Sequence, residues 1–360
     1  MKASPLHPLT SLRFFAAGAI VTGHMASSSL GGLPGDGRYG LGVGFFFVLS
    51  GFILTYVYRD FTGHSVRSFY VARFARLWPV HLVTFLIAAL VIQPNALFVP
   101  VYAITAPINL LMLHAWLPIN GLVFSWNAPS WSISAELWFY ILFPFLAATS
   151  RLGMWFAGLT VIAAIIVISV PAVPSRPFEF WHVHAILQHP AVRVVEFAVG
   201  VAAGRLFNAG VRVRGHATFF EFAAVVAVGF YAATSVAVQG AIAGAGHEKI
   251  GLWYSQSGGL LVFAFAIFVF AQNGGLISRV LSIRALVILG EISFSTYMLH
   301  QLLIRVALKQ EWVLYLGRPA TITVVLILIY FGSYLLWRFI EVPCRRMIIA
   351  KAAPLNSLKV

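Results

Sequence analysis

One histidine lies inside an apolar stretch near the N-terminus, where its side chain could transfer protons. His24 follows Arg13 by eleven positions. Eleven helical steps return to within about 20° of the starting direction and rise about 16 Å, so the two side chains would share a face and could line one cavity. Because imidazole suits general acid–base chemistry near neutral pH, we predict that His24 is catalytic and that Arg13 binds substrate. The alternative is a packed histidine and an arginine that reaches the membrane surface.

A carboxylic acid also lies within an apolar stretch. Glu136 has Ser132 one helical turn before it and Tyr140 one turn after it. An acid in such a place should be paired, hydrogen-bonded or protonated, because a bare charge is costly there. We predict a catalytic role for Glu136 and a substrate-binding role for Tyr140. A hydrogen-bonded anchor without a catalytic role is the alternative.

A third polar group falls on one face of a later apolar segment. Ser293, Tyr297 and His300 follow one another at spacings of three and four residues. Such a stripe faces protein or water rather than lipid, so we predict that these three residues contact substrate. His300 is also the rival to His24 for the role of general base.

Two arginines stand one turn apart in the sequence RFARLWP. Arg73 and Arg76 could bind the phosphates of an anionic substrate, because guanidinium groups bind phosphate through two hydrogen bonds. The alternative is ordinary anchoring of a cytoplasmic helix end. Arg193 and Glu196, three residues apart, are interpreted as a structural ion pair.

No metal site is predicted. His182, His184 and His189 cluster in one loop, but no carboxylate or well-spaced further ligand accompanies them. The single cysteine, Cys344, excludes an intramolecular disulfide and a thiol metal site.

The composition requires a membrane. Of the 360 residues, 60% are hydrophobic and 9% are charged, whereas soluble domains carry about 25% charged residues. The apolar stretches are long and do not alternate as barrel strands do, so we predict an all-α polytopic membrane protein. The net charge of +14 is spread between apolar segments rather than gathered in a patch, which argues against nucleic acid as a partner.

Ten transmembrane helices are predicted, with both termini in the cytoplasm because the arginines then fall mainly in the inner loops. Residues 94–129, which include the short apolar segment 101–117, are interpreted as an outer-side loop with an interfacial or re-entrant helix. Residues 1–345 would form one transmembrane domain and 346–360 a short cytoplasmic tail. The predicted spans are 9–29, 41–58, 74–93, 130–149, 153–171, 189–207, 218–238, 254–272, 285–305 and 319–341.

The order of short motifs resembles the acyltransferase-3 family of membrane-bound acyltransferases, which includes O-acetyltransferases of O-antigens and exopolysaccharides. Each motif is weak by itself, but seven in the expected order are specific. They are Leu12–Ala17 with the arginine-x10-histidine spacing to His24, Gly44–Phe52, Arg73–Pro79, Trp131–Glu136, Arg193–Phe197, Gly290–His300 and Glu341–Pro343.

The resemblance implies an acyl-CoA donor, with acetyl-CoA as the first choice, bound from the cytoplasm near Arg73 and Arg76. The acceptor would be a hydroxyl of a lipid-linked or exported glycan, and no cofactor would be permanently bound. Such a protein would be a multi-pass protein of the inner (plasma) membrane and could work with glycan-assembly proteins. A protein of a different functional class is the alternative, because a transporter or channel could use intramembrane His, Glu and Arg residues as a proton or substrate path.

Overall fold

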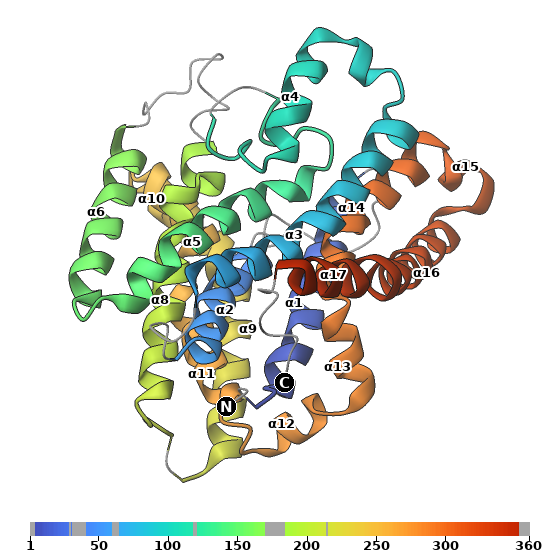
Figure 1. The fold of residues 1–360 in the computed structure, drawn as a ribbon. Helices are drawn as coiled ribbons and strands as arrows, with labels where there is room; N and C mark the ends of the chain where they lie inside the picture. Colours follow the sequence, from blue (N-terminus) through green and yellow to red (C-terminus); the bar gives the residue numbers. More distant parts are fainter. Residues whose placement is uncertain are drawn as a thin grey trace.

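The structure is a computed structural model that describes residues 4–28, 30, 41–59, 65–117, 121–169, 184–213 and 215–352. Within these ranges every regular element is a helix (Figure 1), which confirms the predicted all-α fold. The short helix α4 (Pro100–Leu110) lies at one end of the molecule and α12 (Leu276–Leu281) at the opposite end.

Each of the ten predicted spans coincides with helix. The α10/α11 and α13/α14 pairs each fill one predicted span. The elements are α1 (His7–Ser27), α2 (Leu41–Val57), α3 (Val66–Ile87), α5 (Trp131–Ala148), α6 (Leu152–Ser169), α8 (Pro190–Asn208), α9 (Ala217–Gly244), α10 (Glu248–Ser257) with α11 (Leu260–Ala271), α13 (Arg284–Glu291) with α14 (Ser293–Lys309), and α16 (Arg318–Leu336).

Six helices in the described part of the chain are long and apolar enough to cross a membrane, and the α13/α14 pair, bent by 58°, would be a seventh. This supports a multi-pass membrane protein. Helix α2 has only 17 residues, and α8 carries Arg193, Glu196 and Arg205 along its length. The count of ten spans and the cytoplasmic termini therefore stay predictions.

In its described residues, 94–117 and 121–129, the segment 94–129 contains one short α-helix rather than a further span. Helix α4 has 11 residues, and a helix of that length rises about 16 Å, roughly half of a bilayer core. Trp126 anchors the segment, because its buried ring packs 4.9 Å from Phe85 and 5.7 Å from Tyr102, centroid to centroid. The segment is thus fixed to α3 although it is too short to cross.

Helices α2 and α8 approach each other closely because glycines face each other at their crossing. A Cβ on Gly51 would overlap with the Phe197 carbonyl, and one on Gly200 would overlap with the Val48 carbonyl. Small residues at a helix crossing allow this close approach of the two backbones. The predicted ion pair is also present nearby, with Arg193 Nε 3.0 Å from Glu196 Oε2 and both side chains buried.

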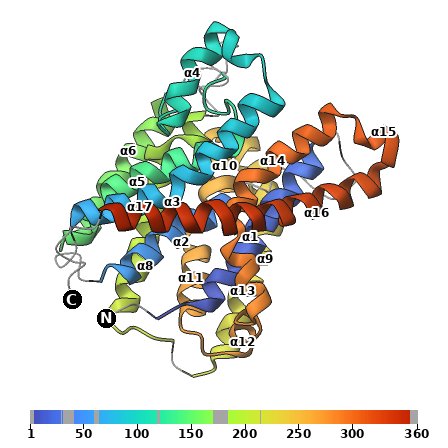
Figure 2. The ribbon, with the colours of Figure 1, turned by 45° about the vertical axis from the view of Figure 1, so that its right-hand side comes forward.

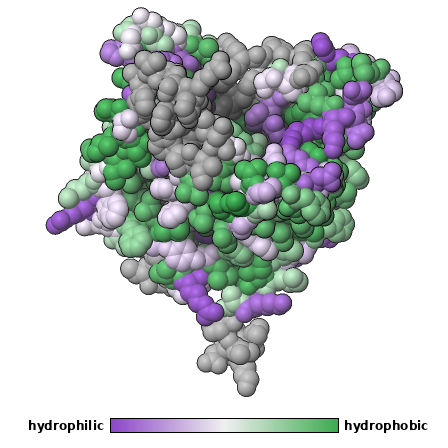
Figure 3. Space-filling model, turned by 90° about the horizontal axis from the view of Figure 1, so that it is seen from above, coloured by the Kyte–Doolittle hydropathy of each residue, from purple (hydrophilic) through white to green (hydrophobic). Residues whose placement is uncertain are grey.

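Much of the surface is apolar, as a lipid-facing surface must be. Ile168 is 73% exposed and Phe230 is 69% exposed. Figure 3 shows apolar side chains spread over the face seen from above, with polar residues in separate groups. Many of the hydrophobic residues that dominate the composition therefore lie on the surface and are not packed inside the protein.

The last helix is continuous over 35 residues, Arg318–Ala352. It consists of α16, the π-helical turn η7 (Trp337–Glu341) and α17 (Val342–Ala352). Figure 2 shows α17 continuing α16 across the front of α3. Residues 346–352 of the predicted tail are thus helical, and residues 353–360 lie outside the described part.

Candidate functional site

A cavity of about 1000 Å³ opens between α1, α2, α3, α5, α14 and the end of the last helix. It brings together residues that are up to some 330 positions apart in the chain, from Arg13 to Arg346. Seven of the nine predicted site residues line it: Arg13, Arg73, Arg76, Glu136, Tyr140, Ser293 and Tyr297.

Positive charge dominates the cavity wall. Six arginines line it against three glutamates, so the space favours an anionic ligand. The arginines are Arg13, Arg73, Arg76, Arg338, Arg345 and Arg346, and the glutamates are Glu136, Glu291 and Glu341. Arg345 and Arg346 reach the cavity because α17 packs against α3, which nothing local in the sequence indicates.

Arg73 is held by aromatic rings rather than by a carboxylate. Its guanidinium carbon lies 5.9 Å from the ring centre of Tyr58, 6.0 Å from that of Phe69 and 5.7 Å from that of Tyr140. No carboxylate of the described residues pairs with it, and its buried Nε has no hydrogen-bond partner there. Arg73 therefore keeps its charge and its donors for a ligand.

Arg76 is engaged in a different way. Its guanidinium forms an ion pair with Glu341, and Ser295 Oγ donates a 2.9 Å hydrogen bond to the other oxygen of that carboxylate. The Phe294 ring centre lies 4.9 Å from the guanidinium carbon. The neighbouring arginines of RFARLWP, which sequence reasoning treated alike, thus differ: one is unpaired and one is paired.

Glu136 is fixed by hydrogen bonds within the cavity wall. Ser50 Oγ donates to its Oε1 at 2.9 Å, and the Tyr140 hydroxyl donates to the same oxygen at 2.5 Å. None of the described residues donates to Oε2. Ser132, one turn earlier, bonds the Pro129 carbonyl instead at 3.1 Å. Ser50 is therefore the partner that sequence spacing did not reveal.

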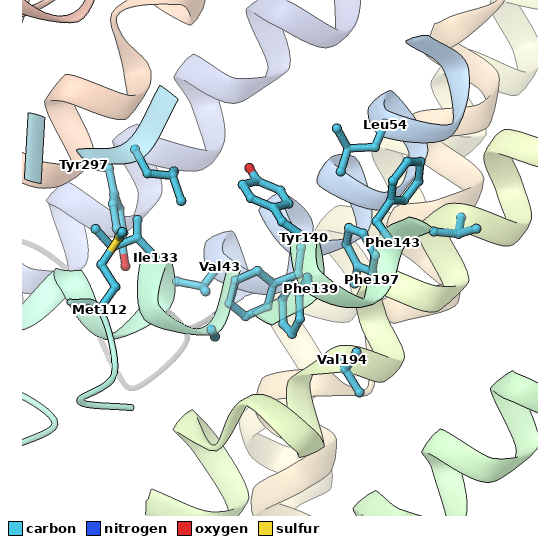
Figure 4. Close-up of a cluster of buried hydrophobic side chains, with 14 of the residues drawn as sticks. Val43, Leu54, Met112, Ile133, Phe139, Tyr140, Phe143, Val194, Phe197 and Tyr297 are labelled. Carbon is cyan, nitrogen blue, oxygen red and sulfur yellow. The ribbon is translucent and has the colours of Figure 1, made fainter. Parts of the chain in front are cut away.

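An apolar cluster holds this part of α5 in place. Figure 4 shows Phe139, Phe143 and Phe197 beside Tyr140. The Phe139 and Phe197 rings stack with centroids 5.3 Å apart, and all three phenylalanines are fully buried. Because Phe139 and Phe143 pack against Phe197 of α8, the part of α5 that carries Tyr140 and Glu136 is held in place beside the cavity.

The two histidines of the predicted site form a pair with each other. His24 Nδ1 lies 2.9 Å from His300 Nε2, and the rings stack with centroids 5.0 Å apart. His300 Nδ1 lies 2.7 Å from the Tyr297 carbonyl oxygen. The pair joins α1 to α14, although 276 positions separate its members.

The expectation that His24 and Arg13 line one cavity is not met. Arg13 lines the cavity, whereas neither His24 nor His300 does. The reason is the length of α1, since the axial separation of about 16 Å carries His24 beyond the cavity end. Tyr297 connects the two regions, because it lines the cavity while its ring centre lies 5.9 Å from that of His300.

Two further histidines have structural partners. His189 Nδ1 accepts a 3.2 Å hydrogen bond from the Ala191 amide and caps α8. His81 bonds the Asn109 carbonyl. His182 lies outside the described residues, and within those that are described no three His, Cys, Asp or Glu side chains could hold a metal ion together.

Comparison with known proteins now adds to this geometry. The Acyltransferase domain family matches residues 7–338. The chain belongs to the acyltransferase-3 family. The resemblance seen in the motifs is thereby confirmed, and all nine predicted site residues lie within the matched range.

A relative supports the same family. The chain is 32% identical over 235 residues to Acyltransferase MdmB of Streptomyces mycarofaciens, which covers 57% of this chain and 58% of the relative. The match thus spans little more than half the length of that relative. No solved structure shows a significant match. Glu341, Arg345 and Arg346, which line the cavity, lie beyond the family match.

Proposed function

We propose that this protein is an O-acyltransferase that moves an acetyl or other short acyl group from acyl-CoA to a hydroxyl. The observation that carries the proposal is the arginine-lined cavity, which ends at Tyr297 beside the His24–His300 pair. Coenzyme A has phosphates at one end and the thioester at the other. A cationic region joined to a proton-transfer group suits that molecule.

The donor phosphates would bind first to the arginines without carboxylate partners. Arg73 supplies an unpaired guanidinium, and Arg345 and Arg346 add charge from α17. Arg76 would stay paired with Glu341 and would attract the phosphates through its positive charge, without leaving that ion pair. The thioester would then extend past the apolar side chains of α2 toward Tyr297.

The proposed chemistry needs one base and one bond exchange. His24 Nε2 takes the proton of the acceptor hydroxyl while the hydroxyl oxygen attacks the thioester carbonyl carbon. The carbon–sulfur bond breaks, and the departing thiolate takes the proton from the His24 imidazolium. The products are an ester and the free thiol of coenzyme A.

Glu136 would hold the acyl-CoA donor in position for this reaction. Its Oε1 is fixed by Ser50 and Tyr140, which leaves Oε2 for the substrate or for Arg13, another residue of the same wall. We therefore assign Glu136 to the catalytic machinery.

The acceptor is proposed to be a hydroxyl of a lipid-linked or exported glycan, with the protein in the inner (plasma) membrane beside glycan-assembly proteins. Membership of the acyltransferase-3 family supports this choice. It also fits a half-buried His24 that lies outside the donor cavity, because a separate acceptor would then approach from another side.

The test is turnover of acetyl-CoA by purified protein in detergent, with release of free coenzyme A thiol measured in the presence of membrane glycolipid extracts. We expect acceptor-dependent thiol release that the His24→Ala protein lacks. A transporter or channel would show no acceptor-dependent thiol release. That result, from protein that still binds acetyl-CoA, would overturn the proposal.

A further inference from the structure

We propose that His300 is a positioning residue that holds His24 in the one tautomer able to act as a base. The proposal rests on the proposed function, because it concerns the proton transfer assigned to His24. It also decides between the two histidines, which the sequence left as rivals.

The hydrogen-bond chain determines where the protons are. A carbonyl oxygen only accepts, so the 2.7 Å contact with Tyr297 requires a proton on His300 Nδ1. A neutral imidazole carries one N–H, so His300 Nε2 has the lone pair and accepts from His24 Nδ1–H at 2.9 Å. His24 Nε2 is then left with its lone pair.

The neutral form of His300 follows from its surroundings. The side chain is 0% exposed, and no carboxylate among the described residues forms an ion pair with it. An imidazolium without a counter-charge in such a place is costly. Both nitrogens of His300 are therefore occupied, one as donor and one as acceptor, which leaves it without a free lone pair for substrate.

The backbone that anchors this chain is itself held. The Tyr297 hydroxyl donates to the Pro129 carbonyl at 3.0 Å, and Asn127 Nδ2 donates to the Met298 carbonyl at 2.8 Å. Helix α14 is thus tied to the segment that precedes α5 at Tyr297 and at Met298, next to the carbonyl that anchors His300. A fixed carbonyl fixes the tautomer of His300 and, through it, that of His24.

In the reaction, His300 would act as the third residue of a catalytic triad does, by orienting the histidine that serves as the base. When His24 Nε2 accepts the hydroxyl proton, its Nδ1–H keeps donating to His300 Nε2, which stabilises and orients the imidazolium. His300 does not touch the substrate in this arrangement. Its removal should therefore lower kcat and leave donor binding unchanged.

Two substitutions separate positioning from packing. In His300→Gln the side-chain oxygen can still accept from His24 Nδ1–H, whereas in His300→Leu nothing accepts. We expect His300→Leu to lose about 10²-fold or more in kcat, and His300→Gln to stay within about tenfold of wild type, because the wrong tautomer alone disables a histidine base. His114→Leu is the matched control, since it also removes a fully buried histidine.

A direct readout uses wild-type protein and so does not depend on the folding of a His300 variant. In protein with ¹⁵N-labelled histidine rings, the His24 signals, assigned by their loss in His24→Ala, should show a proton on Nδ1 and none on Nε2. A wild-type His24 with its proton on Nε2 would overturn the proposal. Near-normal turnover in His300→Leu would do the same, provided that His24→Ala is inactive. Normal turnover in His24→Ala would instead overturn the function proposed for His24, whatever its tautomer.

Discussion

The two ends of α1 lie in unlike surroundings. Arg13, near its start, lines a wide cavity with five other arginines, whereas His24, near its end, contacts the fully buried His300. In the cavity several groups of one charge can share a ligand, so the loss of one is partly compensated. In the histidine pair a single hydrogen bond joins the two rings, so the loss of one group has no substitute. Single substitutions in the arginine-lined cavity should therefore lower activity less than single substitutions in the histidine pair.

The largest effect is expected at His24. His24→Ala should lower turnover by about 10²- to 10⁴-fold, the usual cost of removing a general base, while acyl-CoA binding persists. The measurement is thiol release alongside equilibrium binding of the donor. Thr22→Ala, an exposed change on the same helix, is the control. If His24→Ala keeps more than about a tenth of wild-type turnover, His24 is not the general base, and the two ends of α1 would not differ in the way described.

The next effect concerns stability and lies at the cavity wall. Glu341→Ala leaves Arg76 without its partner, and breaking a buried pair costs about 3–5 kcal/mol. We expect a marked fall in Tm in detergent. The double variant Arg76→Met with Glu341→Ala should recover much of that loss, because no unpaired charge remains. Equal Tm values for the single and double variants would show that the loss does not come from an unpaired charge on Arg76.

A smaller effect is expected for the unpaired arginine. Arg73→Ala should weaken acyl-CoA binding by about 10- to 150-fold, since a charge-assisted phosphate contact contributes about 1.5–3 kcal/mol. Loss of Arg73 should raise KM more than it lowers kcat, the opposite of His24→Ala. Arg205→Ala is the matched control, because Arg205 bonds the Leu146 carbonyl and does not line the cavity. Unchanged donor affinity in Arg73→Ala would reduce that arginine to a topology anchor.

The smallest effect is expected for Glu136→Gln. The amide keeps an oxygen for Ser50 and Tyr140 but loses the charge, and a neutral acceptor forms bonds about half as strong. We expect a loss of roughly tenfold in turnover, or about 1.4 kcal/mol. The Tm should change little. Full activity in Glu136→Gln would make this residue a structural anchor, and the catalytic role would then belong to the histidine pair alone.

Local spacing correctly predicted several relations between side chains of one helix. The helical period placed Arg13 and His24 on one helix, and the i to i+4 spacing placed Tyr140 against Glu136, where the structure has a 2.5 Å hydrogen bond. The spacing of Arg73 and Arg76 predicted that both face one space, and both line the cavity. These relations hold because the geometry of a single helix is the same wherever the helix lies.

Other relations escaped the sequence because they join distant segments. Nothing in the spacing of the tail indicated that Glu341 would pair with Arg76, 265 positions away. The bend of 58° between α13 and α14 was likewise hidden inside one apolar stretch. Both features depend on how far each helix slides and tilts against its neighbours, which residue spacing within one helix does not specify.

By itself, the sequence determined that this is a helical membrane protein, because apolar length and a charge content of 9% leave a chain few other choices. The resemblance to the acyltransferase-3 family came from the order of its short motifs. The sequence also determined which helices carry the reactive side chains. The tertiary structure decided which of those side chains meet. It placed His24 on His300 rather than in the cavity, and it left Arg73 unpaired while pairing Arg76. The physical reason is that a hydrogen bond forms only within about 3 Å, a distance set by the packing of helices remote in sequence.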